Sequence, residues 1–239
     1  MGPLVSVTAT ILAGGIGSRL RPVVADRPKV LATVRGRPFL AYLLDQLATA
    51  GIRQVVLCTG YLGEQVQAAF GAAYHGLHLV YSQEATPLST AGALRLALPL
   101  LQSDPILAMN GDSICEVDLT AFWAWHSAQR AEASLVLARV GDAGRYGKVR
   151  IDASGAVILF EEKGGQSGAG WINAGIYLLK RTSLSAIPAG REVSLERELF
   201  PRWIGRGLFG YRSEGRFLDI GTPEAYATAE EFLAQDPHA

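Results

Sequence analysis

Apolar runs and helical spacings alternate along the first half of the chain. Short, continuous apolar runs predict buried strands over residues 4–13, 54–59, 77–82 and 105–109. Apolar residues at helical spacing predict helices over residues 39–47, 63–70 and 90–101, the first followed by Gly51 and the last beginning at Thr90. Strands that alternate with helices of this length predict a mostly parallel sheet with helices on both faces.

The second half of the pattern is richer in strands. A helix is predicted over residues 121–129, followed by several strands between residues 133 and 179. A closing helix is predicted over residues 221–232, with Pro223 in its first turn. Because the chain shows no repeat, low-complexity tract or linker, we interpret residues 1–239 as a single domain. The predicted fold class is α/β.

The composition narrows the class of protein. The 22 Lys and Arg residues balance 22 Asp and Glu residues, so the chain has no basic surplus for binding nucleic acid or a membrane surface. A hydrophobic share of 49% with 18% charged residues is typical of a globular protein. No apolar run approaches about 18 residues and no cleavable signal stands at the N-terminus, which predicts a cytoplasmic protein.

The cysteines and histidines form no disulfide or metal pattern. Cys58 and Cys115 each lie in an apolar segment, so we expect buried, reduced thiols. The four histidines match no metal spacing, and we interpret them as surface or packing residues.

The strongest chemical signal is a glycine-rich segment, residues 12–22, directly after the first predicted strand. Glycines there let backbone N–H groups converge on phosphate oxygens, and Arg19 and Lys29 add the positive charge that a triphosphate needs. The plain alternative is a tight turn beside two surface cations. The spacing fits neither a P-loop nor the dinucleotide-binding fingerprint, because it lacks Gly-Lys-Ser/Thr and a third glycine at the required positions.

A second signal is Asn110-Gly111-Asp112, which closes a buried strand. Ligands of parallel sheets bind at the carboxyl ends of the strands, so Asp112 is a candidate metal ligand. The alternative is that Asp112 caps the next helix.

The glycine-rich segment, with Pro28-Lys29 after it, closely resembles the signature of the sugar-1-phosphate nucleotidyltransferases. The resemblance spans residues 11–226 and rests on five separated motifs. It implies a Rossmann-like core with a nucleotide-binding half, residues 1–118, and a sugar-binding half, residues 119–239. It also implies dependence on Mg²⁺, with Mn²⁺ as the alternative, and transfer of a nucleotidyl group from an NTP to a sugar 1-phosphate with release of pyrophosphate.

The resemblance assigns the nucleotide to the first half of the chain. It implies that Arg19 and Lys29 are catalytic residues that grip the triphosphate, and that Gln83 and Thr90 belong to the strip that reads the base. The strip departs from the family pattern at Ser89, where the family has glycine, and the alternative role of Thr90 is to cap a helix. The other implied nucleotide-binding residues form the loop: Leu12, Ala13, Gly14, Gly15, Gly17 and Ser18.

The other motifs assign the metal and the sugar. The resemblance implies that Asp112 and Asp219 hold Mg²⁺, and two carboxylates suit a hard cation that keeps several waters; alone, Asp219 is typical of a turn before a helix. Lys163 is expected to hold the sugar phosphate as a catalytic residue, the alternative being a solvated charge run. The implied sugar-binding residues are Tyr146 and Gly147, which otherwise form a simple bend, with Glu162, Lys163 and Asn173.

The choice of substrates rests on resemblance as well. Segments 110–113, 171–177 and 194–198 are most similar to those of bacterial D-glycero-α-D-manno-heptose 1-phosphate guanylyltransferases. This favours GTP as the donor and GDP-heptose, a nucleotide sugar for cell-surface polysaccharide, as the product. Mannose 1-phosphate guanylyltransferases and glucose 1-phosphate thymidylyl- or uridylyltransferases stay open as alternatives.

Two functions from other classes fit the sequence less well. A catalytically silent, nucleotide-sugar-binding regulatory homologue should have lost Arg19, Lys29 or an aspartate, and all are present. A dinucleotide-dependent oxidoreductase is disfavoured by the missing third glycine. The expected partners are therefore the two small substrates, with no nucleic acid and no membrane, while a homo-oligomer stays open.

Overall fold

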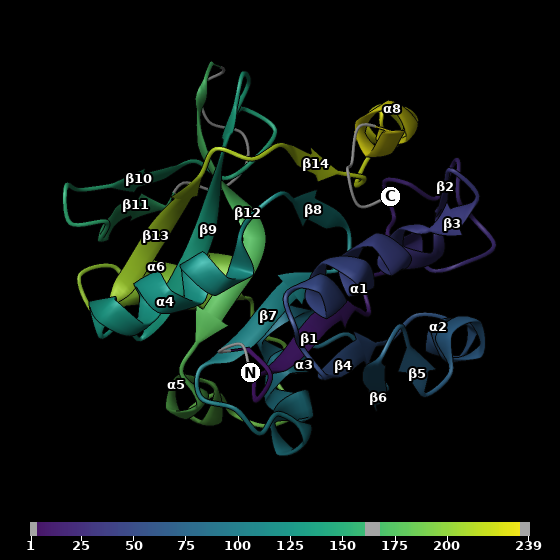
Figure 1. The fold of residues 1–239 in the computed structure, drawn as a ribbon, viewed down its shortest axis with the longest axis horizontal. Helices are drawn as coiled ribbons and strands as arrows, with labels where there is room; N and C mark the ends of the chain where they lie inside the picture. The colour runs from purple at the N-terminus through teal and green to yellow at the C-terminus, as the bar shows by residue number, and fades with distance from the viewer. Residues whose placement is uncertain (1–3, 161–167, 235–239) are drawn as a thin grey trace.

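The centre of the fold is a sheet of eight strands (Figure 1). The computed structural model describes residues 4–160 and 168–234. Across the sheet the order is β13 (Leu208–Ser213), β9 (Ala133–Val140), β12 (Gly170–Leu179), β7 (Ile106–Asn110), β1 (Thr8–Ala13), β4 (Gln54–Thr59), β6 (Leu77–Gln83) and β5 (Ala73–Tyr74). Of these strands, only β12 and β5 run against the direction of the others. The prediction of a mixed, mostly parallel sheet is confirmed.

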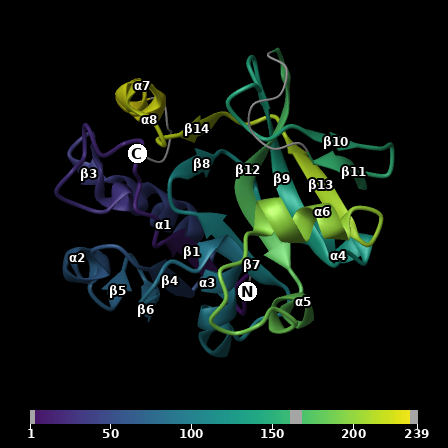
Figure 2. The same ribbon diagram turned by 180° about the vertical axis from the view of Figure 1, so that it is seen from behind.

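Helices cover both faces of this sheet, as the opposite views in Figures 1 and 2 show. One face carries α1 (Phe39–Thr49) and α4 (Leu119–Gln129). The other face carries α3 (Ser89–Ala97) and α6 (Phe200–Trp203). Among the described residues, every helix is too short or too polar to cross a lipid bilayer.

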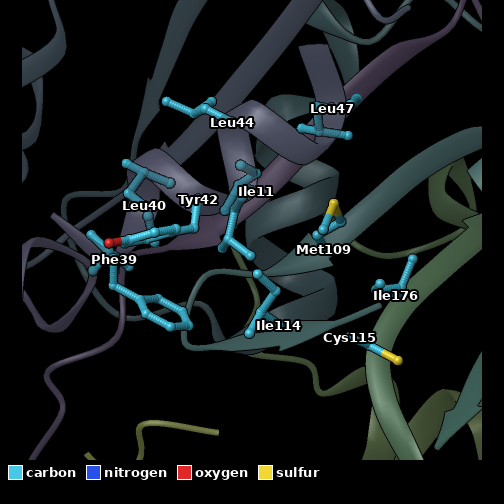
Figure 3. Packing of buried hydrophobic residues seen from close by; sticks show 14 of the residues in the cluster. Ile11, Phe39, Leu40, Tyr42, Leu44, Leu47, Met109, Ile114, Cys115 and Ile176 are labelled. Atoms are coloured by element: carbon cyan, nitrogen blue, oxygen red, sulfur yellow. The ribbon is translucent and has the colours of Figure 1, made fainter. Parts of the chain in front are cut away.

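The strands bury side chains on both faces because successive residues of a strand point to opposite sides. In β4, Val55 and Leu57 join the core beneath α1, whereas Val56 and Cys58 join the core beneath α3. Figure 3 shows Leu44 and Leu47 of α1 in the first core with Ile11 of β1 and Met109 of β7. The central strands are therefore fixed from both sides, and their carboxyl ends hold a defined position.

Smaller elements complete the fold. In chain order they are η1 (Lys29–Leu31), β2 (Thr33–Val34), β3 (Arg37–Pro38), α2 (Gly63–Phe70), η2 (Leu98–Leu100), β8 (Ser113–Cys115), β10 (Val149–Ile151), β11 (Val157–Phe160), α5 (Arg181–Ser185), η3 (Leu195–Leu199), β14 (Phe217–Asp219), α7 (Pro223–Ala227) and α8 (Ala229–Ala234). The pair β14 and β8 is antiparallel and lies apart from the main sheet. In this pair, Asp219 of β14 lies opposite Ser113 of β8.

Three predicted elements differ from the structure by more than two residues at an end or in the number of helices. The strand predicted from residue 4 begins at Thr8, because Val7 N donates to Leu4 O and closes a turn before it. The helix predicted to residue 101 ends at Ala97 and continues as a 3₁₀ turn at Pro99, a residue that lacks an N–H to continue an α-helix. The single closing helix is two helices, α7 and α8, with Thr228 between them.

The cysteines and one histidine are buried. Cys58 and Cys115 are free thiols, as predicted, and burial raises the pKa of each to about 12. His126 is also buried; its Nδ1 lies 2.8 Å from Ser134 Oγ. Burial lowers the pKa of His126 to about 4, so its imidazole is neutral at pH 7.

Candidate active site

A cavity of about 650 Å³ opens at the carboxyl ends of β1 and β7. Its lining contains Leu12, Ala13, Gly14, Gly15, Gly17, Ser18, Arg19, Lys29, Thr90 and Asp112, all predicted from the sequence. A second cavity of about 270 Å³ adjoins it, and the two share Arg19, Thr90, Asn110, Asp112 and Arg197. The arrangement matches the expectation that ligands of parallel sheets bind beyond the carboxyl ends of the strands.

At two glycines in or near the loop, neighbouring atoms come so close to the backbone that a Cβ would not fit. A Cβ at Gly14 would lie 2.7 Å from Glu84 Oε1, and one at Gly111 would lie 2.6 Å from Leu12 O. Gly17 has a φ of +64°, a conformation that L side chains rarely adopt. By contrast, a Cβ at Gly15 would meet nothing within 4 Å, so its backbone is open to the cavity that it lines.

Four charged side chains, those of Arg19, Lys29, Asp112 and Asp219, lie close together where the two cavities adjoin. Lys29 Nζ lies 2.6 Å from Asp112 Oδ2 and 4.0 Å from Asp219 Oδ1, and the lysine side chain is only 10% exposed. A Cβ at Gly221 would lie 2.6 Å from Asp219 Oδ1, 3.1 Å from Lys29 Nζ and 3.4 Å from Arg19 Nη2. Gly221 therefore keeps open the space around which Arg19, Lys29 and Asp219 gather.

Strand pairing brings the two aspartates together. In the ladder between β8 and β14, Asp219 is the partner of Ser113, the residue that follows Asp112. Ile220 N donates to Asp112 O at 2.9 Å and extends this ladder. Asp112 precedes a strand, so the alternative of a helix cap is wrong for it; the cap of α4 is Asp118.

The donor set at this point fits a divalent metal ion. Both carboxylates face one cationic group, Lys29 Nζ, and so already converge on a single region of positive charge. Carboxylate oxygens are the ligands that Mg²⁺ prefers, and this ion keeps several waters or phosphate oxygens. Among residues 4–160 and 168–234 no group of three or more His, Cys, Asp or Glu side chains could hold a metal.

The predicted sugar-binding residues line the smaller cavity where they are described. Tyr146, Gly147 and Asn173 lie there with Asp112 and Asp219. Burial is the main cause of a raised pKa of Tyr146, whose ring centroid lies 5.6 Å from that of Phe217. Glu162 and Lys163 lie outside the described residues.

The base-reading strip is placed differently from its prediction. Thr90 lines both cavities but does not cap α3, because its Oγ1 donates to Glu196 Oε2 at 2.8 Å and accepts from Leu195 N. Ser89 lines the larger cavity with a φ of +59°. Gln83 is exposed and does not belong to the lining.

Several lining residues escaped the sequence prediction. Glu84, the neighbour of Gln83, lines the larger cavity; its Oε2 accepts from Leu88 N at 3.0 Å, and burial raises its pKa. Arg197 adds a cation shared by both cavities, and Asn110 lies between them. Asn110 and Arg197 lie inside the segments 110–113 and 194–198, and Glu84 directly follows Gln83, so the motifs themselves were the available signal.

Cavity volume alone would not locate the site. A cavity of about 670 Å³ lies between α1 and the segment from Ile114 to Thr120, and Arg216 also lines it. None of the predicted site residues that the structure describes is in its lining. The convergence of cations, carboxylates and open backbone selects the cavity beside β1 instead.

Comparison with known proteins agrees with the geometry. The nucleotidyl transferase family matches residues 8–236. The chain is 38% identical to the mannose-1-phosphate guanylyltransferase of Mycobacterium tuberculosis over 233 residues, which are 96% of this chain but 65% of that protein. It is 36% identical to the D-glycero-alpha-D-manno-heptose 1-phosphate guanylyltransferase of Aneurinibacillus thermoaerophilus over 226 residues, 94% of this chain and 97% of that protein.

A solved structure supports the same fold. HddC from Yersinia pseudotuberculosis has a TM-score of 0.85 at 30% identity, covering 95% of this chain and 99% of HddC. HddC has also been solved in complex with GMP-PN, and that structure has a TM-score of 0.84. The chain thus spans less than two thirds of the mycobacterial relative but nearly the whole of HddC.

Proposed function

The chain belongs to the nucleotidyl transferase family, and from this premise we propose that it transfers a guanylyl group from GTP to D-glycero-α-D-manno-heptose 1-phosphate. The products would be GDP-heptose and pyrophosphate. The observation that carries the transferase chemistry is the convergence of Asp112 and Asp219 on Lys29, beside a loop with open backbone. A regulatory homologue without activity has no need of this arrangement.

The chemistry asks the chain to position two anions and to balance their charge. A phosphate oxygen of the sugar 1-phosphate attacks the α-phosphorus of GTP; the new oxygen–phosphorus bond forms as the bond to the β-phosphate oxygen breaks, and pyrophosphate leaves. The attacking oxygen is already an anion near neutral pH, so no general base is required. Arg19 and Lys29 face the leaving pyrophosphate, and Arg197 adds charge between the two cavities.

Mg²⁺ would be held by Asp112 and Asp219, with Mn²⁺ as the alternative ion. When bound, it would neutralise phosphate charge at the point where the two cavities join. The pairing of β8 with β14 holds the carboxylates of Asp112 and Asp219 close to each other, so both could bind the same ion. Chelation should abolish turnover, and added Mg²⁺ or Mn²⁺ should restore it.

The sugar is the finer part of the proposal. Heptose 1-phosphate is favoured because segments 110–113, 171–177 and 194–198 resemble those of the heptose 1-phosphate enzymes, one of which is 36% identical over 94% of this chain. The name of the GMP-PN complex of HddC supports a guanine nucleotide. Mannose 1-phosphate is the second candidate acceptor, because the higher identity of 38% is to an enzyme named for it.

Pyrophosphate release tests the proposal directly. Four NTPs are each mixed with Mg²⁺ and with heptose, mannose or glucose 1-phosphate. We expect the fastest release with GTP and the heptose compound; faster release with the mannose or glucose compound would replace the acceptor. No release in any mixture would contradict the transferase assignment.

Two variants with matched controls test the site. Arg19→Ala and Asp112→Ala should lower turnover about 10²-fold or more with folding retained. Arg21→Ala is the control for the arginine, because Arg21 is exposed, bonds Tyr61 and lies outside the cavity lining. Asp26→Ala is the control for the aspartate, because Asp26 pairs with its neighbour Arg27 at the surface. Wild-type turnover in Asp112→Ala would overturn the assignment.

We place the reaction in the cytoplasm. Two free, buried thiols among the described residues fit a reducing compartment, and the donor NTP is made there. Cell fractionation with the pyrophosphate assay as the readout tests this placement.

A further inference from the structure

One buried oxygen in the active site has no partner. Asn110 ends β7, and its Oδ1 is buried without a hydrogen bond. In the described residues, two other buried side-chain atoms share this condition, on Gln46 and Arg181, but neither residue lines the cavities of the site. Asn110 lines both of them. Buried acceptors in native proteins are nearly always paired, so this oxygen calls for a donor from the ligand.

A hydrogen-bond network fixes which end of the Asn110 amide is bonded to Tyr177 and which end is left for another donor. Tyr177 is fully buried, and its hydroxyl gives its one proton to Glu196 Oε1 at 3.1 Å, because a carboxylate can only accept. The Tyr177 oxygen must then accept from its two amide neighbours, Asn173 Nδ2 at 2.8 Å and Asn110 Nδ2 at 3.4 Å. Asn110 therefore presents its NH₂ to Tyr177 and keeps Oδ1 on the other side.

The network is anchored at its far end. Glu196 Oε2 accepts from Thr90 Oγ1 at 2.8 Å and from Ser194 Oγ at 3.0 Å. Burial and the adjacent Glu196 charge raise the pKa of Tyr177 well above its usual value, so its hydroxyl stays protonated across the working pH range. The orientation of Asn110 is thus set before any ligand arrives.

The chemistry of the substrates limits what can bond this oxygen. Phosphate oxygens are acceptors at neutral pH and have no proton to give, so the phosphates of neither substrate can pair with Oδ1. Hydroxyl groups can donate, and both substrates carry them, on the sugar ring and on the ribose. The guanine N–H groups also donate, but Asn110 lies two residues from Asp112, beside the charged groups assigned to the phosphates, which favours a hydroxyl close to a phosphate. We propose that Asn110 Oδ1 recognises a substrate hydroxyl where the two cavities meet, oriented for this by the Tyr177–Glu196 pair. The proposal rests on the proposed function, since it deepens the substrate contacts of that site.

Deoxy substrates identify the hydroxyl. kcat/KM is measured for wild type and Asn110→Ala with the best substrate pair, with sugar 1-phosphates that each lack one hydroxyl, and with 2′-deoxy- and 3′-deoxy-GTP. For one analogue we expect the kcat/KM of wild type to fall about 10- to 100-fold relative to the complete substrate. The kcat/KM of Asn110→Ala with the complete substrate is already lower by a similar factor, and it should fall little further with that analogue. A sugar analogue with this behaviour places the bond on the sugar, and a ribose analogue places it on the nucleotide.

Additive losses for every analogue would overturn the proposal, because Asn110 would then contact no substrate hydroxyl. Absence of turnover with every substrate pair is a different result and would contradict the proposed function instead. A thermal melt near that of wild type shows that Asn110→Ala is folded. If that variant does not fold, Asn110→Ser, which retains a polar side chain of smaller size, carries the same measurement.

Tyr177→Phe tests the orienting role. Removal of its hydroxyl should raise KM for the substrate that Asn110 binds, with a smaller change in kcat, and should weaken the coupling to the deoxy analogue. In the double variant with Asn110→Ala the coupling to the deoxy analogue is already absent, so Tyr177→Phe should change that coupling no further, whatever it does through Asn173. Tyr81→Phe is the control, because the Tyr81 hydroxyl donates to Gly71 O far from the cavity lining. If Tyr177→Phe lost as much kcat/KM as wild type when the hydroxyl is removed from the substrate, the orienting role would be contradicted.

Discussion

A methyl group at Gly111 should damage the site without removing any of its charged residues. Gly111 N donates to Leu12 O at 2.9 Å and so ties the end of β7 to the end of β1. In Gly111→Ala the new Cβ would lie 2.6 Å from Leu12 O and 2.9 Å from Val30 Cγ1. Ordinary contact begins at 3.4 Å, and a backbone oxygen cannot rotate away as a flexible side chain can.

The size of the effect follows from this overlap. The strand ends must separate by roughly 0.8 Å, the difference between 3.4 and 2.6 Å. Overpacking of this kind costs about 1–3 kcal/mol in the free energy of unfolding. Asp112 is the next residue and moves with the strand end, away from Lys29 Nζ at 2.6 Å. A displacement of about 1 Å in a positioned group lowers turnover on the order of 10²-fold.

Urea unfolding and pyrophosphate release measure the two effects. Gly141→Ala is the matched control, because a Cβ at Gly141 meets nothing within 4 Å and its φ, like that of Gly111, is not in the left-handed region. The control should keep the stability and turnover of wild type. If Gly111→Ala did so too, the close approach of β1 and β7 would not be what positions Asp112.

Three further changes test other parts of the structure. Ser89→Gly should raise the free energy of unfolding by about 1 kcal/mol, because it relieves the φ of +59°. Urea unfolding should show no such gain for Ser89→Ala, and equal gains would refute the strain. Lys29→Met should lower turnover about 10²-fold yet tighten Mg²⁺ binding by the ligand-free protein, because the ammonium 2.6 Å from Asp112 no longer competes; weaker binding by calorimetry would count against the metal site. His126 has a pKa of about 4 when folded and about 6.5 when unfolded, so the unfolded state binds the extra proton between these values. Stability should therefore fall by on the order of 3 kcal/mol as the pH drops from about 6.5 to 4, and His126→Asn should lack this loss in urea titrations at both pH values.

A helix or strand can be predicted from the sequence when the signal for it lies within its own residues. The strand over residues 54–59 and the helix over residues 63–70 have the predicted bounds, because a buried apolar run and an amphipathic spacing are each contained within a few positions. Thr90 shows the limit of this reasoning. Its sequence context favours a helix cap, but its hydroxyl bonds Glu196, 106 residues further along the chain. A local sequence pattern gives no information about a hydrogen-bond partner so far away in the chain.

The exchange of Gln83 for Glu84 in the cavity has a similar cause. Neighbouring residues at the end of a strand point to opposite sides, so one position decides which of them enters the site. Glu84 N donates to Thr59 O and prolongs the pairing of β6 with β4 by one residue. This pairing carries Glu84 to the cavity and leaves Gln83 exposed. Both residues can be read from the sequence, but the register of β6 on β4, which places Glu84 in the cavity and leaves Gln83 exposed, cannot.

The position of Asp219 illustrates what resemblance supplies and what only the fold explains. Phe217–Asp219 is three residues long, too short for a periodic pattern to predict a strand. Resemblance nevertheless assigns Asp219 to the metal, and its partner Ser113 in β8 is the residue next to Asp112. The same strand carries Phe217, whose ring packs against Tyr146 in the smaller cavity. One short ladder therefore ties the carboxylate pair to a wall of the smaller cavity, so a shift of β14 would disturb both together.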